Sequence, residues 1–174
     1  MQSIQTVSEN TIYVGASDRR LAKFENLFPI PRGVSYNAYV ILDEKTALLD
    51  TADASVGAQF LENVAAALDG RKLDYLIVDH MEPDHAAMIE AVLVRWPDLR
   101  LVVNAKTLPM LKMYFPTDSA AIDDALVVKE GDTLDLGKHK LTFVMAPMVH
   151  WPEVMMTFDT NTGTLFSADA FGTF

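Results

Sequence analysis

The sequence predicts a layered α/β fold in one domain, and three observations support this prediction. Half of the 174 residues are hydrophobic and 22% are charged, a balance typical of a compact domain with a substantial core. Strand-like and helix-like segments alternate through the middle of the chain, after a start that resembles a β-hairpin. The helical period then disappears, and short strand-like segments separated by glycines fill the last third.

The first two thirds predict a hairpin followed by alternating strands and helices. Two apolar runs at 36–42 and 46–50 flank the polar residues 43–45, as the strands of a β-hairpin do. Asp53 occupies an N-cap position, and apolar residues at helical spacing follow it as far as Gly70. The other expected elements are strands at 11–14, 75–78 and 99–103 and helices at 89–96 and 108–114.

The last third predicts strands alone. Gly131, Gly137 and Gly163 mark turns between them. The expected strands lie at 125–128, 133–136, 140–145, 154–158 and 164–166. Together with the alternating middle, these segments favour sheets covered by helices.

Composition excludes several classes of protein. The 14 basic and 24 acidic residues give a formal charge of 14 − 24 = −10, which disfavours nucleic-acid binding. The chain contains no cysteine, so disulfides, thiolate zinc sites and a cysteine nucleophile are excluded. No apolar run approaches the ~18 residues of a membrane span. The polar first ten residues lack an apolar signal region, so we expect a cytoplasmic location.

Four metal-type side chains lie within six residues, between an expected strand and an expected helix. They are His80, Glu82, Asp84 and His85. A loop at this position places its side chains at the carboxyl edge of a sheet, where α/β proteins bind ligands. Two nearby carboxylates repel each other unless a cation compensates them, so the cluster indicates a metal site. For Asp84 alone, a role as helix N-cap is an equally good interpretation.

Two further residues extend the candidate site. His150 and Asp169 each follow an apolar strand-like segment, and with the first cluster they give more ligands than one ion needs. A dinuclear site with a bridging carboxylate is the economical interpretation. Iron, zinc and manganese all suit such nitrogen and oxygen ligands. Asp50 either orients a ligand histidine or caps a turn, and we expect His139 to be a solvated surface residue.

These residues resemble the metal site of the flavodiiron proteins, a branch of the metallo-β-lactamase-like superfamily. The loop His80-x-Glu82-x-Asp84-His85 matches that site, with Glu82 where most zinc-binding members carry histidine. The segments 25–37, 150–153 and 166–172 also resemble motifs of that family. The resemblance covers nearly the whole chain.

The resemblance implies a metallo-β-lactamase-like αββα sandwich, of which residues 1–174 hold mainly the N-terminal half and part of the second. It implies reduction of dioxygen to water, or of nitric oxide to nitrous oxide, at a non-haem diiron centre. One iron would bind His80, Glu82 and His150, the other Asp84 and His85, and Asp169 would bridge them. FMN in a flavodoxin-like domain, a donor such as rubredoxin or a flavoprotein reductase, and a head-to-tail homodimer are also implied.

The chain departs from the family pattern in two respects. The family uses one more histidine well beyond the position of Asp169, and the sequence ends five residues after Asp169. No flavodoxin-like phosphate loop is present in it. We therefore expect an incomplete diiron domain without an FMN domain, and no turnover by these 174 residues alone. Two alternatives stay open: a dinuclear zinc hydrolase of the same superfamily, and a non-catalytic remnant.

Overall fold

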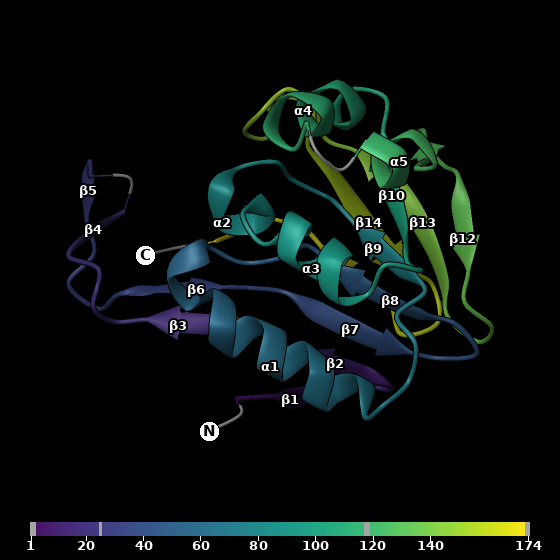
Figure 1. Cartoon of the computed structure of the whole chain (residues 1–174), viewed down its shortest axis with the longest axis horizontal. Helices are drawn as coiled ribbons and strands as arrows, with labels where there is room; N and C mark the ends of the chain where they lie inside the picture. Colours follow the sequence, from purple (N-terminus) through teal and green to yellow (C-terminus); the bar gives the residue numbers. More distant parts are fainter. Residues whose placement is uncertain (1–2, 25, 117–118, 173–174) are drawn as a thin grey trace.

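A seven-stranded mixed sheet forms the centre of the computed structural model, which describes residues 3–24, 26–116 and 119–172 (Figure 1). Neighbouring strands are antiparallel from β1 to β8 and parallel from β8 to β11. In spatial order the strands are β1 (Gln5–Ser8), β2 (Thr11–Tyr13), β7 (Tyr39–Leu42), β8 (Thr46–Leu49), β9 (Tyr75–Ile77), β10 (Arg100–Asn104) and β11 (Leu126–Val128). The predicted hairpin at 36–50 is the pair β7 and β8.

Helices cover one face of this sheet. A 3₁₀ turn (Ala54–Val56) precedes α1 (Gly57–Leu68), and the Asp53 side chain accepts a hydrogen bond from the Ser55 backbone, as an N-cap does. The apolar stripe of α1, which includes Phe60 and Val64, is buried in the first core. The other helices are α2 (Pro83–Ala86), α3 (Ile89–Arg95), α4 (Thr107–Tyr114) and α5 (Ser119–Asp123).

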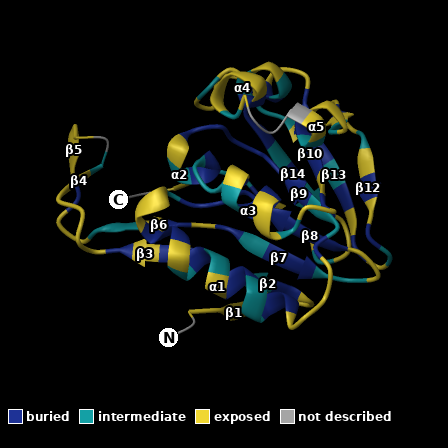
Figure 2. Cartoon of the chain, viewed as in Figure 1, coloured by how far each residue is buried: buried dark blue, intermediate teal, exposed yellow. Residues whose placement is uncertain are grey.

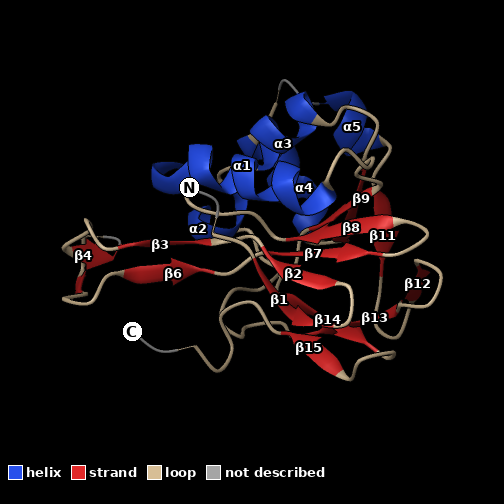
Figure 3. Ribbon diagram, turned by 90° about the horizontal axis from the view of Figure 1, so that it is seen from below, coloured by secondary structure: helices blue, strands red, loops and turns tan. Residues whose placement is uncertain are grey.

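A four-stranded antiparallel sheet packs on the opposite face (Figure 3). Its strands are β12 (Thr133–Asp135), β13 (Lys140–Met145), β14 (Met155–Asp159) and β15 (Thr164–Phe166). Phe143 and Met155 from this sheet form a second core with Leu49 and Val102 of the first. Because helices cover one face of the central sheet and β-strands the other, all four residues of β8 are buried (Figure 2). The layered α/β prediction is confirmed.

An arm extends from the body between β2 and β7. Its base pairs β3 (Ala16–Asp18) with β6 (Val34–Tyr36), and its tip pairs β4 (Lys23–Phe24) with β5 (Phe28–Pro29) (Figure 1). A Cβ on Gly15 would lie 1.9 Å from the Tyr36 carbonyl oxygen, so only glycine fits at this close approach. The sequence did not predict the arm, and Glu25 of segment 25–37 lies outside the described residues.

Two smaller differences separate prediction from structure. The strand β1 and the short helices α2 and α5 were not predicted, because each is too short for a periodic signal. His139 is fully buried, so its predicted surface position is wrong. Among the described helices, none has the length and apolarity required to cross a membrane.

Candidate metal centre

The loop that carries the first cluster is held against the end of β8. The backbone N–H and the hydroxyl of Thr51 donate to the His85 carbonyl at 2.8 and 2.6 Å. Helix α2 begins at Pro83, and Glu82 in extended conformation is its N-cap residue. Asp84 lies inside the first turn, so the N-cap interpretation of Asp84 is wrong.

Four of the predicted residues converge on one point. The Nε2 atoms of His80 and His150 lie 3.1 and 2.9 Å from Oε2 of Glu82, and both lie 3.2 Å from Oδ2 of Asp169. Donor atoms bound to one ion at about 2.0–2.2 Å lie roughly 3 Å from one another. The four atoms are therefore spaced like the first coordination sphere of a single ion.

A second group adjoins the first. The Nε2 atom of His85 lies 2.7 Å from Oδ1 of Asp169 and 3.7 Å from Oδ2 of Asp84. The Oδ1 atom of Asp84 is buried and has no hydrogen-bond partner, and burial raises the pKa of this carboxyl to about 6. Asp169 thus turns one oxygen toward each group. The structure brings all six predicted residues together, in two groups that share Asp169.

Two of these residues lie farther from their strands than the sequence suggested. Strand β13 ends at Met145, five residues before His150, and β15 ends at Phe166, three residues before Asp169. Both side chains therefore project from loops and not from strand ends. Ala168, with a left-handed φ of 48°, turns the chain immediately before Asp169.

The Asp50 carboxylate contacts both histidines of the first cluster, His85 through its ring and His80 through its backbone. Its Oδ2 atom lies 3.0 Å from Nδ1 of His85, and its Oδ1 atom accepts from the backbone N–H groups of Asp79 and His80 at 2.7 and 3.3 Å. Of the two interpretations of Asp50, the structure supports the one in which it orients a histidine. Thr157 donates to Asp79, which joins this network to β14.

Glu153 also belongs to this environment, although it was not among the predicted site residues. Its Oε1 atom lies 2.8 Å from Nδ1 of His80 and accepts from the Met81 backbone at 3.0 Å, and only 1% of the residue is exposed. The only feature of the sequence that pointed to Glu153 was its place in the segment 150–153, which resembles a motif of the family. The spacing in sequence did not indicate that it faces His80.

Opposing effects set the protonation of the centre. Burial lowers the pKa of His80, but the carboxylates of Asp169 and Glu153 outweigh burial and raise the pKa to about 10. In the same way, Asp169 and Asp50 hold the pKa of His85 well above its usual value. Burial raises the pKa of Asp169, but the two histidines lower it far below its usual range. The centre therefore compensates its carboxylates with protonated imidazoles, for which a metal cation can substitute.

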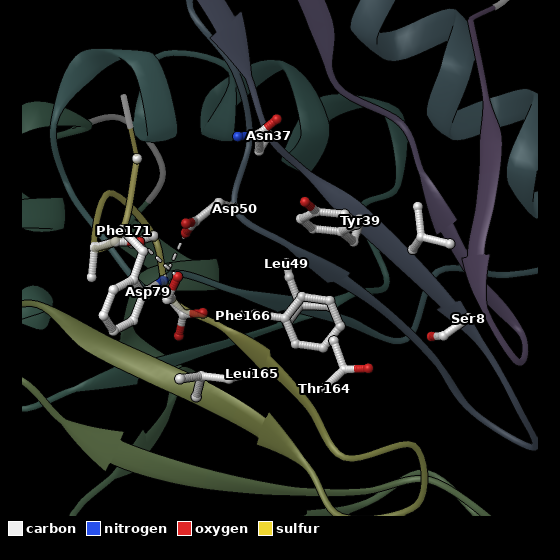
Figure 4. Close-up of a pocket in the computed structure, with 15 residues that line it drawn as sticks. Ser8, Asn37, Tyr39, Leu49, Asp50, Asp79, Thr164, Leu165, Phe166 and Phe171 are labelled. Carbon is white, nitrogen blue, oxygen red and sulfur yellow. Dashed lines mark hydrogen bonds between the residues drawn. The ribbon is translucent and has the colours of Figure 1, made fainter. Parts of the chain in front are cut away.

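Two cavities flank the centre. One, of about 550 Å³, leads to Glu82, His85 and His150 and is bordered by residues of the arm, among them Phe24, Phe28, Arg19 and Arg32. The other, of about 390 Å³, lies behind the centre, where Asp50 and Asp79 face Tyr39 and Phe166 (Figure 4). Of these two cavities, the first is lined by residues of both groups and so gives a small molecule access to them.

The donors fit a pair of divalent ions by their chemistry. The two groups offer imidazole nitrogens and carboxylate oxygens alone, a set suited to iron, zinc or manganese. The buried, unpaired Oδ1 atom of Asp84 is a polar group that a metal ion would satisfy.

Comparisons with known proteins agree with this geometry. Residues 34–174 match the family described as ODP family beta lactamase. The anaerobic nitric oxide reductase flavorubredoxin of Klebsiella pneumoniae is 37% identical over 168 residues, which cover 95% of this chain and 34% of the relative. The chain spans about a third of the length of the curated relatives it matches.

Solved structures extend the agreement to three dimensions. The flavodiiron protein of Giardia intestinalis superposes with a TM-score of 0.91 at 28% identity, over 99% of this chain and 41% of that one. Rubredoxin oxygen:oxidoreductase of Desulfovibrio gigas superposes with a TM-score of 0.84 at 31% identity, over 91% of this chain and 39% of that one. The chain therefore belongs to the ODP family of beta lactamases and is a homologue of the flavodiiron proteins.

Proposed function

We propose that residues 1–174 are the diiron-binding part of an oxygen or nitric oxide reductase, an incomplete diiron domain of that enzyme. One iron binds His80, Glu82 and His150, the other binds Asp84 and His85, and Asp169 bridges the two. The observation that carries this proposal is the position of Asp169, whose two oxygens lie 2.7 and 3.2 Å from histidines of different groups. A carboxylate in that position suits a pair of ions better than one.

Each residue has a defined part in this proposal. When bound, a pair of ferrous ions would supply two electrons, which reduce two nitric oxide molecules to nitrous oxide and water or provide half of the four electrons that turn dioxygen into water. Glu82, Asp84 and Asp169 bring negative charge that stabilises the oxidised ions, and the histidines complete the coordination. The cavity beside the arm admits the gas to the centre.

The rest of the proposal concerns parts outside this domain. Two of the relatives are named as a nitric oxide reductase and a rubredoxin oxygen:oxidoreductase, and both are longer than this chain. By analogy, we propose that FMN on another domain delivers the electrons, that rubredoxin or a flavoprotein reductase is the donor, and that a head-to-tail homodimer brings flavin and iron together. The cytoplasmic location stays a prediction.

A dinuclear zinc hydrolase is the second candidate function. The same donor types bind zinc, and a zinc-bound water attacks esters in such enzymes. Glu82 argues against it, because most zinc hydrolases of the superfamily carry histidine at this position. The names of the relatives favour the reductase.

Metal selectivity tests the proposal. The purified chain is loaded anaerobically with ferrous iron and zinc in competition, and both metals are measured per chain. Iron at about two per chain supports the diiron proposal, and about one iron supports a single complete site. Preferential zinc uptake would favour the hydrolase, and failure to take up either metal would overturn both metal-dependent proposals.

A further inference from the structure

Glu153 is a buried carboxylate beside the candidate centre but outside both ligand groups. Its Oε1 atom lies 2.8 Å from Nδ1 of His80, and it also accepts from the Met81 backbone N–H at 3.0 Å. One carboxylate oxygen therefore holds both the His80 ring and the backbone of the next residue, Met81. A carboxylate can only accept hydrogen bonds, so Nδ1 of His80 is the donor in this contact.

The end of β10 fixes the backbone of Glu153. The Nδ2 atom of Asn104, at the end of β10, donates to the Glu153 carbonyl at 2.5 Å, and Lys106 Nζ donates to the Pro152 carbonyl at 3.0 Å. The Trp151 ring stands perpendicular to the His80 ring at 5.3 Å. The loop that carries His150 is thus held by Asn104 and Lys106 through its backbone. It also contacts His80 through the side chains of Glu153 and Trp151.

We propose that Glu153 is a positioning residue for the metal centre. Its contact with Nδ1 keeps a proton on that nitrogen, so Nε2, which faces Glu82 and Asp169, is the nitrogen that gives up its proton to bind metal. It also fixes the loop of His150 to the loop of His80, so that both imidazoles are placed before metal binds. This inference rests on the proposed function, because the groups that it positions are the proposed metal ligands.

Asp50 offers a comparison from the same site. It contacts His85 through Nδ1, as Glu153 contacts His80, and such partners raise the basicity of a ligand histidine and fix its ring. Asp50 uses both oxygens, whereas Oε2 of Glu153 is buried without a hydrogen-bond partner. Glu153→Gln can therefore keep the acceptor Oε1 in place, while Glu153→Ala removes it.

Cobalt(II) binding to the full 174-residue chain provides the test, with affinity and the visible d–d spectrum as readouts. We expect Glu153→Ala to weaken binding about 10- to 100-fold, as loss of such a partner typically does, and to change the spectrum. We expect Glu153→Gln to lose less than Glu153→Ala. On the zinc-loaded protein, ¹⁵N–¹H spectra should show a hydrogen-bonded, slowly exchanging Nδ1–H of His80 in the wild type, and a shifted, faster-exchanging signal in Glu153→Ala.

Asp159→Asn supplies the matched control. Asp159 is a fully buried carboxylate 2.9 Å from Nδ1 of His139, and it lies at the far end of β14 from the centre. This variant should lose folding stability but bind Co²⁺ with wild-type affinity and spectrum, which separates positioning from general destabilisation. If Glu153→Ala does not fold, the affinity and ¹⁵N spectrum of Glu153→Gln decide.

The outcomes are distinct. Wild-type affinity, spectrum and Nδ1–H exchange in the folded Glu153 variants would overturn the inference and leave the proposed function standing. An equal loss of affinity in Asp159→Asn would also overturn it, because stability alone would then explain the effect. Failure of the wild-type chain to bind Co²⁺ would overturn the proposed function and the inference with it.

Discussion

The Nε2 atom of His85 lies 2.7 Å from Oδ1 of Asp169, although 84 residues separate the two in sequence. The other oxygen of Asp169 lies 3.2 Å from Nε2 of His150, in the neighbouring group. One carboxylate in the segment after β15 thus contacts both helix α2 and the loop between β13 and β14. If both groups hold metal, Asp169 is the residue on which both sites depend.

Replacing this bridge should reduce the metal content. In Asp169→Asn, the amide keeps one acceptor oxygen but presents an NH₂ group, which cannot coordinate a metal, to the other group. We expect the content to fall from about two ions per chain to about one or fewer, measured by elemental analysis after anaerobic loading. Asp135→Asn, on the exposed edge of β12, is the control and should keep both ions. Two ions bound to Asp169→Asn with wild-type affinity would argue against a bridge.

Asp50→Asn should weaken the group that contains His85. Both Asp50 oxygens accept hydrogen bonds, one from backbone N–H groups and one from the His85 ring. An asparagine amide placed in either orientation sets an NH₂ group against one of these donors, at a cost of about 1–3 kcal/mol in stability. We expect about 10- to 100-fold weaker cobalt(II) binding at this group.

Comparing the group that contains His80 with the group that contains His85 makes the Asp50→Asn test specific. The Nδ1 atom of His80 is held by Glu153 and not by Asp50, so cobalt(II) binding at the group that contains His80 should change less in Asp50→Asn. Equal weakening of both sites would instead indicate that Asp50 acts on the whole loop through its backbone contacts.

Metal binding should release protons and strengthen as the pH rises. The raised pKa of His80, about 10, and that of His85 leave both imidazoles protonated at neutral pH, and a metal ion must displace one proton from each. We expect release of about two protons per chain at pH 7 when both groups fill. Calorimetry in buffers of different ionisation enthalpy measures this number. Release of no protons would mean that the histidines are neutral before metal binds.

The same pKa shift predicts the stability of the metal-free chain. A histidine whose folded pKa is raised stabilises the fold fully below its ordinary pKa of 6.5, and this contribution is lost as the pH rises through about 10. Metal-free protein should therefore lose stability over that range, while metal-loaded protein should lose less. Urea unfolding at a series of pH values measures both, and equal pH dependence of the two forms would contradict the prediction.

Local signals explain which parts of the site could be predicted. His80, Glu82, Asp84 and His85 are close in sequence, so their chemistry was readable without a structure. Glu153 was not, because its contact with His80 depends on how two distant loops pack. The alternating strands and helices were predictable from periodicity.

The arm and His139 could not be predicted for different reasons. The arm strands are two or three residues long, too short for alternation to give a signal in the sequence. His139 lies in a glycine- and lysine-containing turn, which is typical of surface, yet the turn folds its ring inward against Asp159. Tertiary contacts outweighed local composition in both cases.

His139→Ala should destabilise the fold without affecting the candidate centre. The fully buried ring lies 2.9 Å from Asp159 Oδ2, so its removal leaves a cavity and takes a donor from a buried carboxylate. We expect a loss of about 2–4 kcal/mol in the free energy of unfolding, measured with urea. The exposed neighbour Lys140 provides the control, since Lys140→Ala should change stability by no more than about 0.5 kcal/mol. Wild-type stability in His139→Ala would mean that the ring is exposed in solution, as the sequence pattern alone suggested.

Metal binding should be unaffected by this change. Folded His139→Ala should bind cobalt(II) like the wild type, because neither ligand group includes this turn.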